Sequence, residues 1–563
     1  MIYHCEDHTC NYWDEGEKLP ERCPQCGRKL LRANEADMTG DDWTALGNTL
    51  WDAEASDKKR MVDCFRKAAY LGSAWGVCNL GICMEQGNGV EADPVQAFWL
   101  YQQAVEMGSL NAVCCLGVCY EYGIGTAPDA KQAAELYCKA AEYGSPRGQM
   151  LLAHAFHDGI GVEADAAEAV HWVRAAAYQR YGEGMHRLGV CYEYGDGVEQ
   201  NWERAVHWFR EAAESGVSAA MTDLGYCYEK GCGVEQSWEQ AFSWYRRGAE
   251  CGYPVSMSNL GLCYKRGYGV DQNWQEAIKW YEQGAQCGHL QSMNNLAYCY
   301  DYGEGVEQNE ERALYWYRRG AEAGSDYCMY CLGWNYSNGE GVEQNMTEAI
   351  RWYTAAAEGG NADAMHDLGW LYDHGEGVEQ DMKKAICWYE RAAEQNHPAA
   401  MNSLGECYAM GRGVPRDLET AMEWYRRAAE LGEAMADYNM GWHLEQAGKL
   451  SEAYAHYRKA ADGNDDSAWW ALGRFYENGV VVAQDGKEAR RCYETGEKLG
   501  NVKCKMRLAR CKLLGIGGRR AKKAGLDLCR QALELAKESS EKEDYGYEAE
   551  MNLLRRTIAE NES

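Results

Sequence analysis

The sequence is dominated by an internal repeat of 36 residues. A Leu-Gly or Leu-Ala pair recurs at this spacing from Leu80 to Leu404 without a break, and less regular copies extend the series at both ends. A repeat of roughly 20 to 50 residues builds a solenoid, in which each repeat buries its apolar face only against its neighbours. We therefore expect one array of about thirteen repeats over residues 39–518, rather than several globular domains.

Each repeat has the pattern of two α-helices. In the copy that starts at Ala219, Met221, Leu224 and Tyr228 lie on one apolar face of a first helix, and a Gly-x-Gly pair such as Gly231 and Gly233 ends it. A residue that favours the helix N-cap then precedes each second helix. These residues, 36 apart, are Asp93, Asp129, Asp165, Asn201, Ser237, Asn273, Asn309, Asn345, Asp381 and Asp417. The pattern predicts an all-α fold.

Aromatic, methionine and cysteine residues also recur in columns. Trp172, Trp208, Trp244, Trp280, Trp316, Trp352, Trp388 and Trp424 are 36 apart in the second helix, and most are followed by Tyr. Large rings dominate core energetics, so we expect these indoles to pack between the layers. The cysteines in register with Cys227 and the methionines in register with Met221 are expected to be core residues, because equivalent positions in adjacent layers are too far apart for disulfides.

The repeat is recognisable as a known type. The segment from Ala219 to Gly252, AAMTDLGYCYEKGCGVEQSWEQAFSWYRRGAECG, resembles the Sel-1-like repeat (SLR) family, relatives of the tetratricopeptide repeats. The resemblance covers roughly Asp41 to Gly518. It implies a right-handed α/α superhelical solenoid that binds other proteins, and it supplies no catalytic residues.

Composition and charge narrow the class of partner. Lys and Arg total 57 against 87 Asp and Glu, which leaves a net charge of −30 and makes nucleic acid an unlikely partner, because phosphate-backbone binding needs a basic face. A column of loop carboxylates, including Glu199 and Glu235, predicts a solvated edge, or alternatively one that steers a basic partner. No leader-like N-terminus and no long apolar run occur, so we expect no membrane segment. The 26 cysteines are then most simply free thiols or metal ligands of a cytoplasmic protein.

The first 38 residues carry two cysteine pairs with the spacing of a small zinc ribbon. The expected ligands of one structural zinc ion, in the pattern C-x4-C-x12-C-x2-C, are Cys5, Cys10, Cys23 and Cys26. His4 or His8 is an alternative to Cys5 or Cys10, and four unligated thiols are the alternative to a metal site. Four thiolates complete a tetrahedron, which argues against a catalytic zinc ion.

The C-terminal segment, residues 519–563, begins with the basic stretch Arg519, Arg520, Lys522 and Lys523. A helical pattern rich in Leu, Glu and Lys follows it. The last repeat of a solenoid needs a polar outer face, so we expect these residues to form capping helices.

Candidate binding residues are found by removing the packing positions from the first helix. The adjoining positions, 223, 226 and 230 with their copies at 36-residue spacing, form what we call the variable stripe, because its residues differ from repeat to repeat. Solenoids present their first helices on the concave side, and Tyr, Trp and Arg are common interface anchors. The predicted partner-binding residues are Tyr194, Asp223, Tyr226, Arg266, Asn295, Tyr298, Tyr302, Trp334, Asp367, Trp370 and His374. The alternative is random variation at unconstrained solvent positions.

These patterns predict a non-enzymatic adaptor, scaffold or inhibitor that binds a protein or peptide on its concave face. No spacing of Ser, His, Asp or Cys indicates a catalytic set. The alternative is a nucleic-acid-associated regulator that uses the zinc ribbon and the basic stretch while the solenoid recruits proteins.

Overall fold

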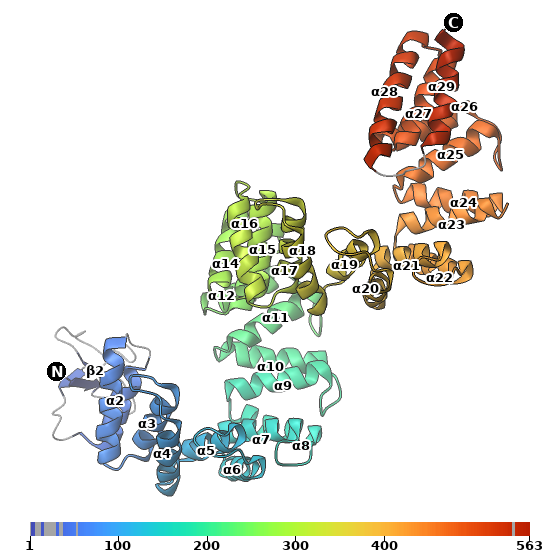
Figure 1. Cartoon of the computed structure of the whole chain (residues 1–563). Helices are drawn as coiled ribbons and strands as arrows, with labels where there is room; N and C mark the ends of the chain where they lie inside the picture. Colours follow the sequence, from blue (N-terminus) through green and yellow to red (C-terminus); the bar gives the residue numbers. More distant parts are fainter. Residues whose placement is uncertain are drawn as a thin grey trace. The chain divides into compact units, whose positions relative to one another are not determined.

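The computed structural model describes residues 2–5, 13–15, 30–32, 38–51, 55–542 and 547–562. The chain forms two compact units, Met1–Ser292 and Met293–Ser563. Within each unit, helices pair in sequence order and successive pairs pack side by side (Figure 1). The predicted α/α solenoid is confirmed.

The N-terminal segment contributes a small antiparallel sheet to the first unit. β1 (Ile2–Cys5) lies between β2 (Trp13–Glu15) and β3 (Leu30–Arg32), with Tyr3 opposite Asp14 on one side and Arg32 on the other. Most of the predicted zinc ligands lie outside the described residues. Only the backbone of Cys5 belongs to the described residues. The other proposed ligands, Cys10, Cys23 and Cys26, lie outside them, so the zinc site stays a prediction.

The helices of the first unit are α1 (Gly40–Thr49), α2 (Ala55–Tyr70), α3 (Ala74–Gln86), α4 (Pro94–Glu106), α5 (Leu110–Tyr122), α6 (Ala130–Glu142), α7 (Pro146–Asp158), α8 (Ala166–Tyr178), α9 (Gly182–Tyr194), α10 (Trp202–Glu214), α11 (Ser218–Lys230), α12 (Trp238–Glu250), α13 (Pro254–Arg266) and α14 (Trp274–Gln286). The boundary between the units falls within α15 (Leu290–Tyr302).

The helices of the second unit are α16 (Glu310–Glu322), α17 (Asp326–Asn338), α18 (Met346–Glu358), α19 (Ala362–His374), α20 (Met382–Glu394), α21 (Pro398–Met410), α22 (Leu418–Glu430), α23 (Ala434–Gln446), α24 (Leu450–Asp462), α25 (Asp466–Asn478), α26 (Gly486–Lys498), α27 (Val502–Leu514), α28 (Lys522–Lys542) and α29 (Glu548–Glu562). At the C-terminus, α28 packs on α27, and α29 packs on both. None of the helices in the described part of the chain has the length and apolar character needed to span a membrane.

The predicted helix ends are confirmed by their hydrogen bonds. All ten predicted N-cap residues accept a hydrogen bond from a backbone N–H in the first turn of their helix; for example, Asn201 Oδ1 accepts from Arg204 N at 2.9 Å. At the end of α11, Gly231 has a φ of +75° and donates to Cys227 O at 2.9 Å. Gln236 Nε2 donates to Glu229 O at 2.8 Å, so the loop also satisfies the helix C-terminus.

In the first unit, the second glycine of the loop lets adjacent repeats pack closely. Gly233 has a φ of +69°, and a Cβ at this position would lie 2.4 Å from the carbonyl oxygen of Trp202, the first residue of the preceding second helix. Any side chain would collide with that backbone. The Gly-x-Gly pair therefore combines a helix stop with a contact between repeats.

The expectation for the tryptophan column is wrong about which ring fills the core. Each of these indoles is half-buried, whereas the residue that follows it is buried in every copy. Tyr245, for example, is 1% exposed, while Trp244 lies at the surface with the Arg247 guanidinium 4.2 Å from its ring centroid. The structural role assigned to Trp belongs to its neighbour, and Trp covers the edge of the core.

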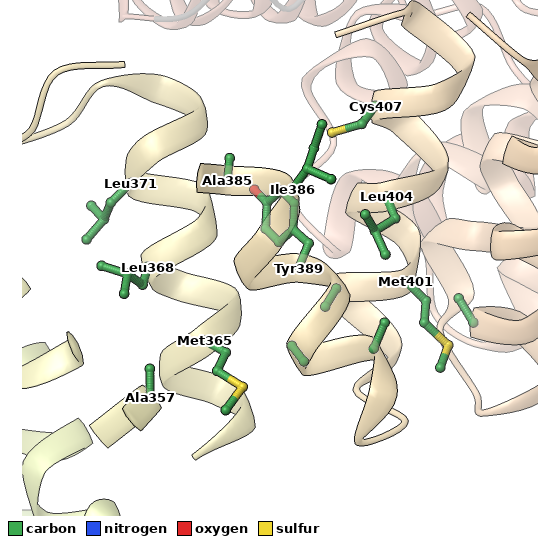
Figure 2. Packing of buried hydrophobic residues seen from close by; sticks show 14 of the residues in the cluster. Ala357, Met365, Leu368, Leu371, Ala385, Ile386, Tyr389, Met401, Leu404 and Cys407 are labelled. Carbon is green, nitrogen blue, oxygen red and sulfur yellow. The ribbon is translucent and has the colours of Figure 1, made fainter. Parts of the chain in front are cut away.

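The buried ring has a fixed environment. A Cβ on Gly225 would lie 2.6 Å from Tyr245 Cε1, which explains the glycine of the Leu-Gly pair, and the Tyr245 hydroxyl donates to Glu229 Oε2 at 2.8 Å. Figure 2 shows the equivalent Tyr389 in the second unit, between Leu368 of α19 and Leu404 of α21. Each such ring thus joins the first helices of two successive repeats.

The cysteine and methionine columns belong to the core, as predicted. Cys227, Cys263 and Met221 are buried in the first unit, and Cys407 and Met401 in the second. Every cysteine whose side chain the structure describes is a free thiol.

Candidate interaction surface

In the first unit, the variable stripe places exposed side chains on the first helices. Tyr194, at the end of α9, is 72% exposed, and Tyr226 and Arg266 are also exposed. The Lys230 ammonium lies 5.8 Å from the centroid of the Tyr226 ring. The packing positions of these helices face the core, whereas these side chains face solvent.

The two predicted aspartates differ from the rest of the stripe. Asp223 Oδ2 lies 2.6 Å from His186 Nε2 of the preceding first helix, and the Tyr330 hydroxyl donates to Asp367 Oδ2 at 3.3 Å. Both carboxylates are therefore engaged between adjacent repeats. Of the three stripe positions, those of Tyr226 and Lys230 supply the most exposed surface.

In the second unit, the stripe begins with tyrosines and continues with tryptophans. The rings of Tyr298 and Tyr302 lie 4.5 Å apart on α15, where Asn295 is half-buried. One and two repeats later, Trp334 is 46% exposed and Trp370 is 38% exposed. Indoles are among the side chains most often found as binding hot spots.

A groove of about 580 Å³ lies beside Trp370, between α19, α21 and the start of α23. The Trp370 ring stacks on His374 with centroids 4.2 Å apart. Met410 and Met435 line the groove and are exposed. Flexible methionines beside a rigid indole make a surface that adapts to apolar side chains.

Three charged side chains of this groove interact with one another. Asp373, only 3% exposed, forms an ion pair with Arg412, whose Nη1 lies 2.8 Å from Asp373 Oδ1, and Arg412 Nη2 lies 3.7 Å from Glu406 Oε2. Burial raises the pKa of the Tyr389 hydroxyl, and the negative charge of Asp373 raises it further. The Tyr389 hydroxyl therefore stays protonated at neutral pH.

Sequence reasoning missed part of this surface. Trp442, the next tryptophan of the stripe after Trp370, is 38% exposed, and its position two residues after Met440 would have identified it despite the irregular repeat there. Arg412 and Met435 had no such signal. Arg412 lies in the loop after α21 and Met435 lies in α23, and only the packing of the repeats brings them to the groove.

Two other predicted features gain structural detail. Arg520 of the basic stretch is engaged within the fold, since its Nε donates to Leu513 O at 3.1 Å and its Nη2 to Asn561 Oδ1 at 2.7 Å. The loop carboxylates, such as Glu199 and Glu235, are exposed. Among the described residues, no cluster of three or more His, Cys, Asp or Glu side chains is arranged to hold a metal ion.

Comparison with protein families gives one family match. The Sel1 repeat matches residues 76–109, 112–145, 146–181, 182–217, 218–253, 254–289, 290–325, 326–361, 362–397, 398–433, 434–465 and 468–501. These segments cover most of the chain, and each coincides with a first helix and the second helix that follows it.

The solved structures that are similar to this chain include two with Sel1-like repeats. A protective antigen of uropathogenic Escherichia coli strains, which displays an SLR fold, is 29% identical over 76% of this chain and 94% of its own, with a TM-score of 0.55. A Sel1 repeat protein from Oxalobacter formigenes is 32% identical over 44% of this chain and 99% of its own, with a TM-score of 0.42. No curated protein matches.

Proposed function

The chain belongs to the Sel1 repeat family, and on that premise we propose that it is a non-enzymatic adaptor or inhibitor that binds a partner protein or peptide along the variable stripe. The observation that carries this proposal is the set of exposed aromatic residues on the first helices, led by Trp334 and Trp370. Proteins of this family generally mediate protein-protein interactions. The concave side is the proposed location, because first helices line it in solenoids.

Contacts between repeats support this location. First helices of successive repeats contact one another at α3–α5, α5–α7 and α11–α13 in the first unit and at α25–α27 in the second. Helices on the inner side of a curved stack are the closer ones, so these contacts favour the first helices as the inner layer. We propose the cytoplasm as the compartment, since the described cysteines are free thiols.

The test compares exposed rings on the two layers of the second unit. Trp334→Ala with Trp370→Ala removes two rings of the stripe, whereas Tyr315→Ala removes an exposed ring of the second-helix layer. The full-length chain serves as bait in extracts of its native cell. The double variant should bind the proteins that the wild type retains with about 30-fold lower affinity, which corresponds to about 2 kcal/mol at a hot spot. The Tyr315 variant should bind as the wild type does.

Two outcomes contradict the proposal. One is a wild-type chain that retains no protein at any concentration, and the other is a set of bound proteins that the Trp334 and Trp370 substitutions leave undiminished. We rank nucleic acid as the second class of partner, because Arg520 is already engaged in the fold. Steep salt-dependent retention on immobilised DNA or RNA would reverse that ranking.

A further inference from the structure

The repeat formed by α7 and α8 lacks the buried ring. In the preceding repeat, the Tyr137 ring packs against Gly117, where a Cβ would lie 2.5 Å from Tyr137 Cε1, and its hydroxyl donates to Glu121 Oε2 at 2.6 Å. The residues 36 positions later are Ala153, His157 and Val173. All three members of the arrangement differ, so neither the ring nor its acceptor is present here.

A pocket of about 370 Å³ lies at this place. Ala153 and Val173, which replace the glycine and the ring, line it together with Cys191 of the next repeat. Its other apolar lining residues are Met150, Ala169 and Val170. An apolar protein cavity of about 150 Å³ is enough to bind benzene, so this pocket has room for an aromatic ring.

The mouth of the pocket is polar. His157 Nδ1 is hydrogen-bonded to Asp158, and His157 Nε2 lies 3.2 Å from Asp196 Oδ2. Arg187 Nη2 lies 3.8 Å from the same Asp196 oxygen. His154 Nε2 lies 3.0 Å from Asp158 Oδ2. These side chains are between one-third and about half exposed, so a ligand that enters passes charged groups before it reaches the apolar floor.

The mouth is also part of the variable stripe. His154 and Asp158 occupy the repeat positions of Tyr226 and Lys230, and Arg187 occupies that of Asp223. The pocket therefore opens on the face to which the proposed function assigns the partner.

We propose that this pocket receives a phenylalanine side chain of the bound partner. That the side chain comes from a bound partner rests on the proposed function. That it is apolar and aromatic rests on the size and lining of the pocket. A side chain that enters from the stripe leads with its ring tip, which comes to rest between Ala153, Val170 and Val173, while its main chain stays beside Asp158 and Arg187. An apolar tip fits that floor. A tyrosine hydroxyl would be buried there without a hydrogen-bond partner, so Phe is favoured over Tyr.

The first experiment tests the pocket alone, with toluene as the Phe side chain and the full-length chain labelled at its methionine and valine methyl groups. Toluene should shift the signals of Met150 and Val170 with a dissociation constant of about 1 mM or below. The triple variant Ala153→Gly/His157→Glu/Val173→Tyr gives this repeat the residues of its neighbour, so it should fold and bind toluene at least about tenfold more weakly. His171→Glu, at an exposed position of α8 outside the pocket, should bind as the wild type does.

The second experiment tests the side chain, with N-acetyl-phenylalanine amide and N-acetyl-tyrosine amide as probes. The Phe probe should bind at least about tenfold more tightly than the Tyr probe, and the triple variant should bind neither. No toluene binding, or equal binding by the triple variant, overturns the pocket. Toluene binding without Phe-probe binding overturns the assignment to a partner side chain. Failure of the proposed function would instead appear at Trp334 and Trp370, in the other compact unit.

Discussion

Replacing Tyr245 with alanine should be among the most damaging single changes in the first unit. The ring is buried against Gly225 on one side and belongs to the same apolar cluster as Cys263 of the next repeat. Loss of a buried aromatic ring costs about 3–5 kcal/mol, because a cavity remains. Tyr245→Phe keeps the ring and removes only the hydrogen bond to Glu229, whose Oε1 still pairs with Lys230 Nζ at 2.8 Å, so it should cost about 1 kcal/mol.

The adjacent Trp244 provides the control. Its ring is half-buried, and solvent fills the space when it is removed, so Trp244→Ala should cost about 1–2 kcal/mol, including the contact with Arg247. Tyr245→Ala is thus expected to be clearly more damaging than either Trp244→Ala or Tyr245→Phe.

Hydrogen exchange measured by mass spectrometry on the full-length chain resolves this order locally. Repeats contact only their neighbours, so exchange should accelerate in α11 to α14 and stay unchanged in distant repeats. About 4 kcal/mol corresponds to about 1,000-fold faster exchange for Tyr245→Ala, against about tenfold for Trp244→Ala. Equal acceleration by the two alanine variants would refute the assignment of the buried ring to the Tyr column and would restore Trp as the core residue.

Three further predictions concern the loops, a buried carboxyl group and the N-terminal cysteines. Gly252 has a φ of +84° and open space around it, so Gly252→Ala should lower the free energy of unfolding in urea by about 1 kcal/mol. Gly233→Ala adds a collision with the Trp202 carbonyl oxygen and should lower it by at least about 3 kcal/mol. Equal costs would contradict the close contact between Gly233 and Trp202. Burial raises the pKa of Asp465 to about 6, above its value in the unfolded chain, so its contribution to stability is lost as the pH rises from about 4 to 6. Asp465→Asn, which keeps an acceptor for Ala468 N, should therefore match the wild type near pH 4 and exceed its thermal midpoint at pH 7; a wild-type advantage at pH 7 would be the contrary result. Elemental analysis should find one zinc ion per chain that Cys23→Ser with Cys26→Ser removes, and a metal-free wild type would end the zinc proposal.

Helix ends and repeat length were predictable because their causes are local. An Asn201 side chain reaches a donor three residues away, and Gly231 adopts a backbone conformation that few other residues tolerate. These features need no knowledge of the neighbouring repeats. The same holds for the exposed stripe positions, which follow from helical periodicity once the packing face is known.

The choice between Trp244 and Tyr245 was not local. Both columns repeat every 36 residues, and adjacent positions on a helix point about 100° apart, so periodicity alone leaves both as core candidates. What decides is the position of the second helix between two first helices. The available signal was chemical, since a buried Tyr needs a hydrogen-bond partner, and a carboxylate stands 16 residues before the Tyr in several repeats, as Glu229 does for Tyr245.

The groove beside Trp370 shows a further limit of sequence reasoning. Trp370 and His374 were predicted from their register, but Arg412 reaches the buried Asp373 from a loop in the next repeat. Met435 comes from the repeat after that. Contacts of this kind depend on the rotation from one repeat to the next, which the spacing of residues along the chain does not encode.

The residues of the variable stripe either vary at random or are selected for binding, and the structure of the repeat helps to decide between these alternatives. Buried rings, caps and loop glycines hold the repeats together, so a change at an exposed stripe position alters stability by less than about 0.5 kcal/mol. Stability therefore does not select what stands there. Random variation on the surface of a chain with a net charge of −30 would favour polar residues, yet the position of Tyr226 holds Tyr298, Trp334, Trp370 and Trp442 in other repeats. Large exposed rings carry a solubility cost and no folding benefit, so their recurrence favours selection for binding.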